Sequence, residues 1–171
     1  MGHKSSKHVD EVTDPVEKFR RDALKTQNAY RELHGAPPLR FSNKLDEHAQ
    51  EWANHIAEMG MAKQRKEIPY GENVAWMWSE SGQDEFTGKA AVDKFYSDVT
   101  KYDFQKGASI DGQSAKNFTQ LVWKSSTEVG IGYAINPKDP KDMYAVFNYY
   151  PAGNIPGDFK ANVKQPRQKK K

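Results

Sequence analysis

Side chains suited to acid–base or metal chemistry are sparse in this chain. Its 171 residues include five histidines and no cysteine, so neither a disulfide framework nor a thiolate zinc site can form. His3 and His8 lie in a polar N-terminal segment, while His34, His48 and His55 fall on predicted helices. We expect all five imidazoles to be exposed rather than catalytic. The missing thiols favour a reducing compartment.

The N-terminal residues carry a pattern for covalent lipid attachment. Glycine follows the first methionine and serine stands at the sixth position, which is the pattern of N-myristoylation. One myristoyl chain holds a protein on a membrane only marginally, so stable docking needs a second element such as a polybasic patch. We predict that Gly2 is the lipid anchor. The basic residues expected to face anionic lipid are Lys4, Lys7, Lys164, Arg167, Lys169, Lys170 and Lys171.

Composition favours one folded domain with two polar tails. The mean hydropathy is low, at −0.94, but aromatic residues make up 12% of the chain, which is too many for a disordered sequence. We predict a disordered arm over 1–13, a folded domain over 14–159 and a solvated basic tail over 160–171. No aromatic residue is interleaved with the lysines of the tail, which disfavours a nucleic-acid role.

The apolar segments are too short for a membrane span. The longest purely apolar run, Val74 to Trp78, falls far below the roughly 20 residues that a spanning helix needs. The N-terminus also lacks the apolar stretch of a secretory signal. We therefore expect a cytoplasmic protein that associates with a membrane surface and is not secreted.

Three helices are predicted around whatever site the chain builds. The segment Asp14–Glu17 offers an N-cap aspartate, a proline at the first helical position and a capping-box glutamate, so a helix should begin there and end at His34. Apolar residues at helical spacing predict a second helix over about 43–60 and a third over 86–102. On the second helix, the residues expected to lie outside are Gln50, Glu51 and Asn54.

Two β-rich segments complete the predicted fold. Residues 129–135 and 143–150 are rich in β-branched and aromatic side chains, and a turn with two prolines separates them. This pattern predicts an antiparallel pair. Together with the helices it predicts an α+β domain in which a small antiparallel sheet is covered on both faces.

Three segments go beyond a generic α+β pattern: 70–76 (YGENVAW), 116–123 (KNFTQLVW) and 148–154 (NYYPAGN). In type and order they resemble the signature segments of the CAP superfamily, and the resemblance covers about residues 16–158. The absence of cysteine and the Pro-Ala-Gly-Asn sequence resemble the Golgi-associated pathogenesis-related branch. The resemblance implies a three-layer α-β-α sandwich. It also implies homodimers and makes the Golgi a candidate compartment.

Members of that family carry a central cleft in which two histidines, beside two acidic residues, bind a divalent metal that is commonly zinc. By the resemblance, the histidines would fall at Gln64 and Asn117, and the acids at Glu72 and Asp98. Amides are weak ligands for zinc, so we predict no zinc and no other cofactor, with weak binding of a hard cation left open. We expect Glu72 to be a buried acid held by backbone amides.

Two further features of the family are incomplete here. A hydrolase activity attached to parts of it would need a serine where Trp78 stands, and no imidazole at position 64 or 117 could act as general base. A loop implicated in sterol binding corresponds to Tyr102 and Phe104, but a third aromatic residue is missing. We expect Phe104 to belong to the core, which leaves these two residues as a candidate sterol loop.

These observations predict a non-enzymatic, membrane-associated CAP protein that binds anionic phospholipid or sterol, and partner proteins, on the cytosolic face of a membrane. Two alternatives stay open. One is a divalent-metal-dependent hydrolase or protease acting through the cleft. The other is an oligomerising interaction module without affinity for lipid.

Overall fold

The computed structural model describes residues 14–168. The expected disordered arm, Gly2, Lys4, Lys7 and Lys169–Lys171 lie outside the described residues. The elements are α1 (Pro15–Leu33), β1 (Arg40–Phe41), α2 (Asn43–Met59), β2 (Gly71–Trp78), η1 (Gly82–Asp84), α3 (Gly88–Tyr96), η2 (Ser97–Lys101), β3 (Tyr102–Asp103), β4 (Ala108–Ser109), α4 (Lys116–Leu121), β5 (Glu128–Ile135), β6 (Asp142–Tyr150) and α5 (Phe159–Asn162).

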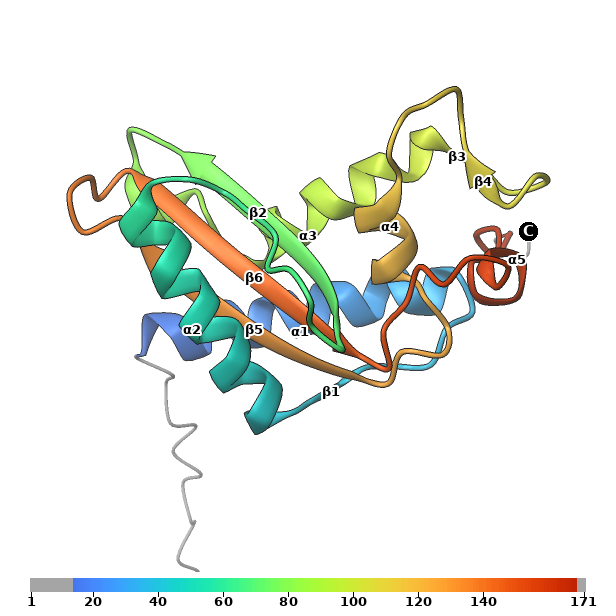
Figure 1. Ribbon diagram of the computed structural model, residues 1–171, viewed down its shortest axis with the longest axis horizontal. Coiled ribbons are helices and arrows are strands. Elements are labelled where there is room, and N and C mark those ends of the chain that lie inside the picture. Colours follow the sequence, from blue (N-terminus) through green and yellow to red (C-terminus); the bar gives the residue numbers. More distant parts are fainter. Residues whose placement is uncertain (1–13, 169–171) are drawn as a thin grey trace, which may run out of the picture.

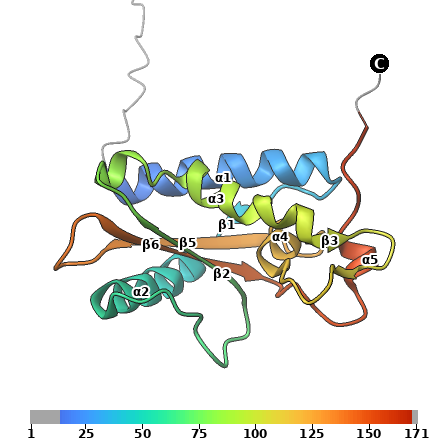
Figure 2. The ribbon, with the colours of Figure 1, turned by 90° about the horizontal axis from the view of Figure 1, so that it is seen from above.

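The predicted three-layer α+β sandwich is confirmed. A four-stranded sheet has the order β1-β5-β6-β2, in which β1 pairs with β5 in parallel and the other neighbours are antiparallel. One face is covered by α2 and the other by α1 and α3 (Figures 1 and 2). The short strands β3 and β4 form a separate antiparallel pair beyond the end of α3. Each face of the main sheet buries its own apolar cluster.

Local signals fix the first helix where the sequence predicts it. The Asp14 side chain accepts a hydrogen bond from the backbone N–H of Val16 at 2.9 Å, and Pro15 occupies the first helical position. The helix ends at Leu33 with His34 as its C-cap, and Gly35 takes the left-handed conformation with φ of 70° that few other residues adopt at low cost.

The long helix α2 lies unusually close to β5. A Cβ atom on Gly130 would come within 2.0 Å of the Leu45 backbone, and one on Gly132 within 2.4 Å of the Ala49 carbonyl oxygen. Only glycine at both positions lets the helix approach the strand at this distance. The contact holds α2 across the middle of the sheet.

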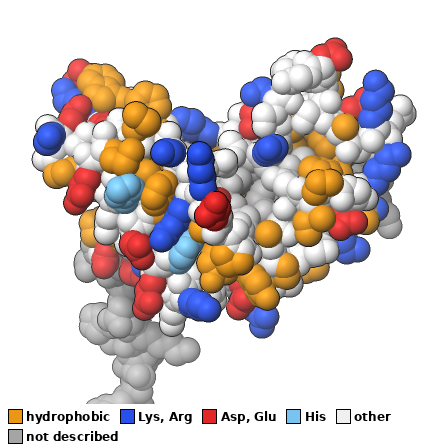
Figure 3. All heavy atoms as spheres, viewed as in Figure 1, with side chains coloured by type: hydrophobic (Ala, Val, Ile, Leu, Met, Phe, Trp, Pro, Cys, Tyr) orange, Lys and Arg blue, Asp and Glu red, His pale blue; other side chains and the backbone are white. Residues whose placement is uncertain are grey.

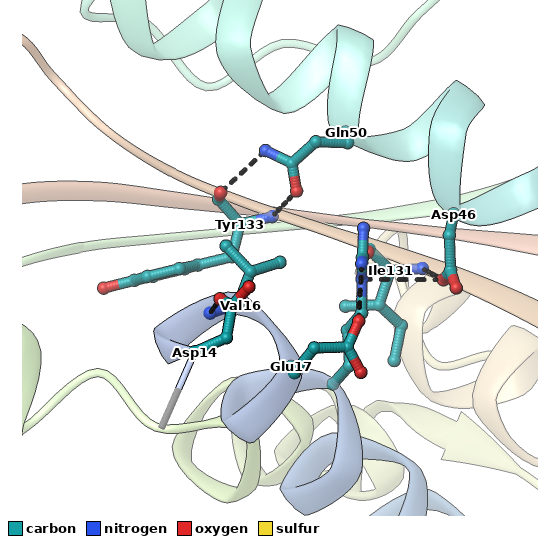
Figure 4. Close-up of polar contacts among 8 residues, drawn as sticks. Asp14, Val16, Glu17, Asp46, Gln50, Ile131 and Tyr133 are labelled. Carbon is teal, nitrogen blue, oxygen red and sulfur yellow. Dashed lines mark hydrogen bonds and ion pairs between the residues drawn. The ribbon is translucent and has the colours of Figure 1, made fainter. Parts of the chain in front are cut away.

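Side chains close the edge of β5 where β1 no longer pairs with it (Figure 4). The amide group of Gln50 bonds both backbone groups of Tyr133, at 3.0 Å to the N–H and 2.8 Å to the carbonyl. Asp46 accepts from the N–H of Ile131, and Arg20 donates to the Ile131 carbonyl. Gln50 is therefore half-buried, which corrects the expectation that it lies outside, and a sheet edge is blocked against further pairing.

The third helix is shorter than the predicted 86–102. It begins after Thr87, whose hydroxyl caps the N–H of Ala90, and ends at Tyr96. The Ser97 hydroxyl donates to the Lys94 carbonyl at 2.6 Å, and the chain continues as the 3₁₀ helix η2 before it enters β3. A serine hydroxyl that bonds the preceding turn competes with the helical pattern, which accounts for the early end.

The ordered domain continues past the boundary expected at residue 160. Helix α5 crosses it, and Val163 is only 3% exposed. The backbone N–H of Arg167 donates to the Leu33 carbonyl at 2.7 Å, and His34 Nδ1 lies 2.7 Å from the Lys164 carbonyl. The expectation of an exposed His34 is wrong, because this side chain is 1% exposed beneath the returning chain.

Candidate functional site

Glu72 lies near the start of the edge strand β2, and two hydrogen bonds hold its carboxylate. The backbone N–H of Arg65 donates to Oε1 at 2.6 Å, and Asn148 Nδ2 donates to Oε2 at 3.0 Å. The predicted backbone amide is thus one of its two partners. Burial raises the pKa of this carboxyl above its ordinary value, while the bonds from Arg65 and Asn148 act in the opposite direction.

A histidine that the sequence did not single out joins this group. His48, half-buried on α2, places Nδ1 3.0 Å from Asn148 Oδ1, and its ring meets Tyr70 edge to face at 4.9 Å. The expectation of exposure is therefore not met at His48, whereas His55 is exposed. Because Asn148 bridges the two, His48 and Glu72 belong to one hydrogen-bonded chain.

The other two expected site residues share a cavity. Asp98 and Asn117 line a space of about 350 Å³ between β2, α3 and α4. Asp98 pairs with Lys101 at 2.9 Å, and the Asn117 carbonyl accepts from Asn73 Nδ2 at 2.9 Å. Figure 3 shows a hollow on this side, between the part of the molecule that carries β2 and the part that carries β3, β4 and α4.

The contacts of the four expected positions fall into two pairs. Gln64 Nε2 donates to the Glu72 carbonyl at 3.4 Å, so these two residues lie together at the edge of β2. Asp98 and Asn117 lie together in the cavity. Within residues 14–168, no three histidine, cysteine or acidic side chains are grouped as metal ligands.

The donor set does not fit zinc. Both oxygens of Glu72 already accept hydrogen bonds, and the carboxylate of Asp98 is paired with a lysine. The positions at which the resemblance would place imidazoles carry amides, and Gln64 uses its amide nitrogen as a donor. A zinc site requires imidazole, thiolate or carboxylate lone pairs directed at one point.

The position expected for a nucleophilic serine carries an exposed indole. Trp78 donates from Nε1 to Asp139 at 3.1 Å. The hydroxyl of the next residue, Ser79, donates to the carboxylate of Glu85 at 2.6 Å rather than to an imidazole. This part of the site therefore lacks the serine and histidine pairing of a hydrolase.

The candidate sterol loop is part of the core. Tyr102 is 4% exposed, and the Phe104 ring lies 5.0 Å from it, 6.1 Å from His34 and 6.1 Å from Phe118. Phe104 is half-buried against the main apolar cluster, as predicted. The Tyr102 hydroxyl is buried and has no hydrogen-bond partner among the residues described.

A larger cavity opens elsewhere and contains none of the expected site residues. It measures about 700 Å³ and lies between the start of α1 and the start of α3, where Phe19, Phe86 and Tyr133 line it. The Tyr133 ring stacks on Phe19 with centroids 4.6 Å apart. We assign no chemistry to this cavity.

Two of the expected lipid-facing residues are described by the structure. The side chains of Lys164 and Arg167 are exposed, although the backbone of each is bonded to α1. In the part of the chain that is described, no helix combines the length and the apolar character that crossing a bilayer requires.

Comparisons with known proteins give concordant results. A sequence profile of the Cysteine-rich secretory protein family, CAP, matches residues 24–149. The human "Golgi-associated plant pathogenesis-related protein 1" is 34% identical over 155 residues, which cover 88% of this chain and 95% of that protein. "Repressed by EFG1 protein 1" of Candida albicans is also 34% identical, over 81% of this chain and 48% of its own length. The solved structure "Crystal structure of NaASP2 with Zn2+" has a TM-score of 0.64 at 17% identity and covers 90% of each chain.

Proposed function

Because the chain belongs to the CAP family, we propose that it is a non-enzymatic, membrane-associated binding protein. Its ligands are anionic phospholipid, with sterol and partner proteins as further candidates, on the cytosolic face of a membrane. The name of the human relative makes the Golgi the first compartment to examine. The observation that carries the proposal is the docked C-terminal segment, whose backbone is bonded to α1 while Lys164 and Arg167 face outward.

This segment can supply the second of the two signals that stable membrane anchoring requires. An acyl chain on Gly2 supplies the hydrophobic signal, and one such chain needs a basic patch for stable docking. Each lysine or arginine near an anionic leaflet contributes about 1 kcal/mol. Since the segment is fixed to the body of the protein, its basic side chains act from a defined surface.

The side chains of the cleft support the non-enzymatic part of this proposal. A solved neighbour is described with Zn²⁺. By the resemblance, the two imidazole positions of the family correspond to Gln64 and Asn117 in this chain. The carboxylates that remain are engaged by protein donors. Elemental analysis of the purified protein tests the alternative of a metal-dependent hydrolase, which requires a divalent ion bound in stoichiometric amount.

Co-sedimentation with vesicles containing phosphatidylinositol phosphates tests the proposal. We expect myristoylated wild type to bind, and Gly2→Ala to bind much more weakly. We expect Lys164→Gln with Arg167→Gln, in a chain that ends at Gln168, to lose about tenfold or more in affinity. If wild type stays in the supernatant at physiological salt, the proposal is wrong.

A second copy of the chain is the partner to examine next. Homodimers are implied by the resemblance to the Golgi-associated branch, and light scattering of the protein without vesicles measures them. Self-association without any vesicle binding would favour the interaction module over the lipid-binding protein.

A further inference from the structure

The outer face of α1 carries a row of basic side chains. Lys18, Arg21 and Lys25 recur at intervals of three and four residues, so they share one side of the helix, and all three are exposed. The opposite side of the same helix buries Phe19, Ala23, Gln27 and Arg31 against the rest of the fold. The row therefore faces solvent along the first half of α1.

Acidic side chains lie beside this row, and two of them have other partners. Asp84 lines one cavity together with Lys18. Asp22 accepts from the backbone N–H of Lys89 at 2.7 Å, and Glu17 pairs with Arg20 at 3.1 Å. Among residues 14–168, the ion pairs involve none of the three basic residues of the row. Glu32 is exposed near the end of the helix and follows Lys25 by seven residues, so it lies on the same side as the row.

The two ends of the described chain lie at opposite ends of this helix. Asp14 caps its start, and the C-terminal segment returns to its last turn through the bond from Arg167 to Leu33. Figure 2 shows that both ends are on the side of the molecule that carries α1, whereas α2 covers the opposite face of the sheet. The row occupies the half of α1 next to Asp14, and the C-terminal segment lies at the other end of the helix.

We propose that the outer face of α1 is the surface that lies against the membrane, with Lys18, Arg21 and Lys25 contacting anionic lipid headgroups. The inference rests on the proposed function and adds the orientation of the protein on the bilayer. A bilayer is the occupant that fits, because Lys164 and Arg167 lie at the end of α1, and the described chain starts at the other end of the helix, 12 residues after Gly2 in the sequence. The negative potential of an anionic leaflet complements the row.

A matched pair of triple variants tests this orientation. Lys18→Gln, Arg21→Gln and Lys25→Gln remove three charges from the α1 face, and glutamine is tolerated well in a helix. Lys44→Gln, Lys63→Gln and Lys66→Gln remove three exposed charges from α2 and the loop after it, on the other side of the sheet. With myristoylated protein and vesicles containing anionic lipid, we expect the first triple variant to bind about tenfold or more weakly than the second.

A spin label gives an independent measure of the contact. The chain contains no cysteine, so Ala29→Cys on the outer face of α1 and Glu47→Cys on the exposed side of α2 each provide one labelling site. On vesicle binding, a nitroxide at position 29 should become shielded from a water-soluble relaxation agent. A nitroxide at position 47 should stay accessible.

The outcomes separate this inference from the proposed function. If myristoylated wild type does not bind vesicles, the proposed function itself fails. If wild type binds but the two triple variants bind equally, or position 47 is shielded in place of 29, membrane association stands and the α1 orientation is wrong. If both triple variants lose the same affinity relative to wild type, the loss reflects net charge, and the α1 face is not the docking surface.

Discussion

Glu72 shows how burial and hydrogen bonding oppose each other at one carboxylate. Burial raises its pKa above the ordinary value of 4.5, while the donors Arg65 and Asn148 favour the charged form. Asn148 also accepts from His48, so the state of one side chain affects the orientation of the next. The arrangement holds three polar residues in place at the edge of the sheet and engages both oxygens of the carboxylate.

The raised pKa of Glu72 predicts a pH effect on stability. The folded protein binds the proton more tightly than the unfolded chain, so the contribution of Glu72 is fully present below its ordinary pKa and is lost as pH rises through the folded value. Glu72→Gln removes this loss. The free energy of unfolding of the variant, measured in urea relative to wild type, should therefore increase between about pH 4 and pH 7.

This comparison isolates the carboxylate and its coupling to neighbouring charges, because titrating groups that do not interact with Glu72 are common to both proteins and cancel. The glutamine side chain of the variant can still accept from the Arg65 amide, and Asn148 can turn its own amide to bond it. A difference between the two proteins that stays constant with pH would contradict the pKa assignment.

At this scale the sequence predicts residue identities better than residue surroundings. The amides at positions 64 and 117 could be recognised from the segments around them, because those segments resemble a family pattern. The surroundings of His48 and His34 could not, because Asn148 and Lys164 lie 100 and 130 residues away along the chain. Helical position alone suggested exposure for both.

At the scale of elements, one glutamine bonds the part of the β5 edge at Tyr133, beside the part at Ile131 that Asp46 and Arg20 bond. Gln50 satisfies both backbone groups of Tyr133 from the neighbouring helix. Gln50→Ala leaves these groups without their partner in a partly buried place, which costs about 1–3 kcal/mol. Urea unfolding should show this loss, whereas Glu47→Ala on the exposed side of α2 should change stability by less than about 0.5 kcal/mol. Equal effects of the two substitutions would show that the edge bonds contribute nothing.

The ends of helices can be predicted from the sequence where neighbouring residues determine them. The cap at Asp14 and Pro15 places the start of α1 as predicted, since it depends on neighbouring residues only. The third helix was predicted to continue to residue 102 because apolar residues recur at helical spacing. The Ser97 hydroxyl and the pairing of Tyr102 with Ser109 in the β3–β4 strands end it earlier. Strand pairing of this kind depends on distant residues and is not visible in periodicity.

At the scale of the whole molecule, the C-terminal segment is part of the fold. Asn162 bonds the N–H and the hydroxyl of Ser125, and Val163 is buried. Ending the chain after Phe159 removes these contacts and the carbonyl partner of His34. Burial of one valine and loss of these hydrogen bonds predict a destabilisation of about 2–5 kcal/mol.

Thermal unfolding of two truncated chains measures this effect. A chain that ends at Phe159 should unfold at a clearly lower temperature than wild type, and a chain that ends at Gln168 should match wild type. The chain that ends at Phe159 is therefore unsuitable for testing the role of charge in membrane binding, because its fold is also destabilised. Identical unfolding of all three chains would contradict the docking of this segment.

The three-layer architecture was predictable because helix caps, strand patterns and three family-like segments all point to it. The extent of the ordered domain was not, because a lysine-rich sequence resembles a solvated tail. The backbone of that segment bonds to the end of α1, while its charged side chains stay in water. Amino-acid composition indicates the charges but not the backbone hydrogen bonds. The same separation of backbone and side chain is what gives the protein a fixed basic surface.

The salt dependence of vesicle binding tests most directly whether an acyl chain and this basic surface act together. The affinity of myristoylated wild type for vesicles with anionic lipid would be measured from about 0.05 M to 0.5 M salt, over which electrostatic attraction is progressively screened. We predict tight binding at low salt that falls with rising salt toward about 10⁴ M⁻¹, the level of a myristoyl chain alone. An affinity that does not change with salt, or no binding at any salt concentration, would contradict the account.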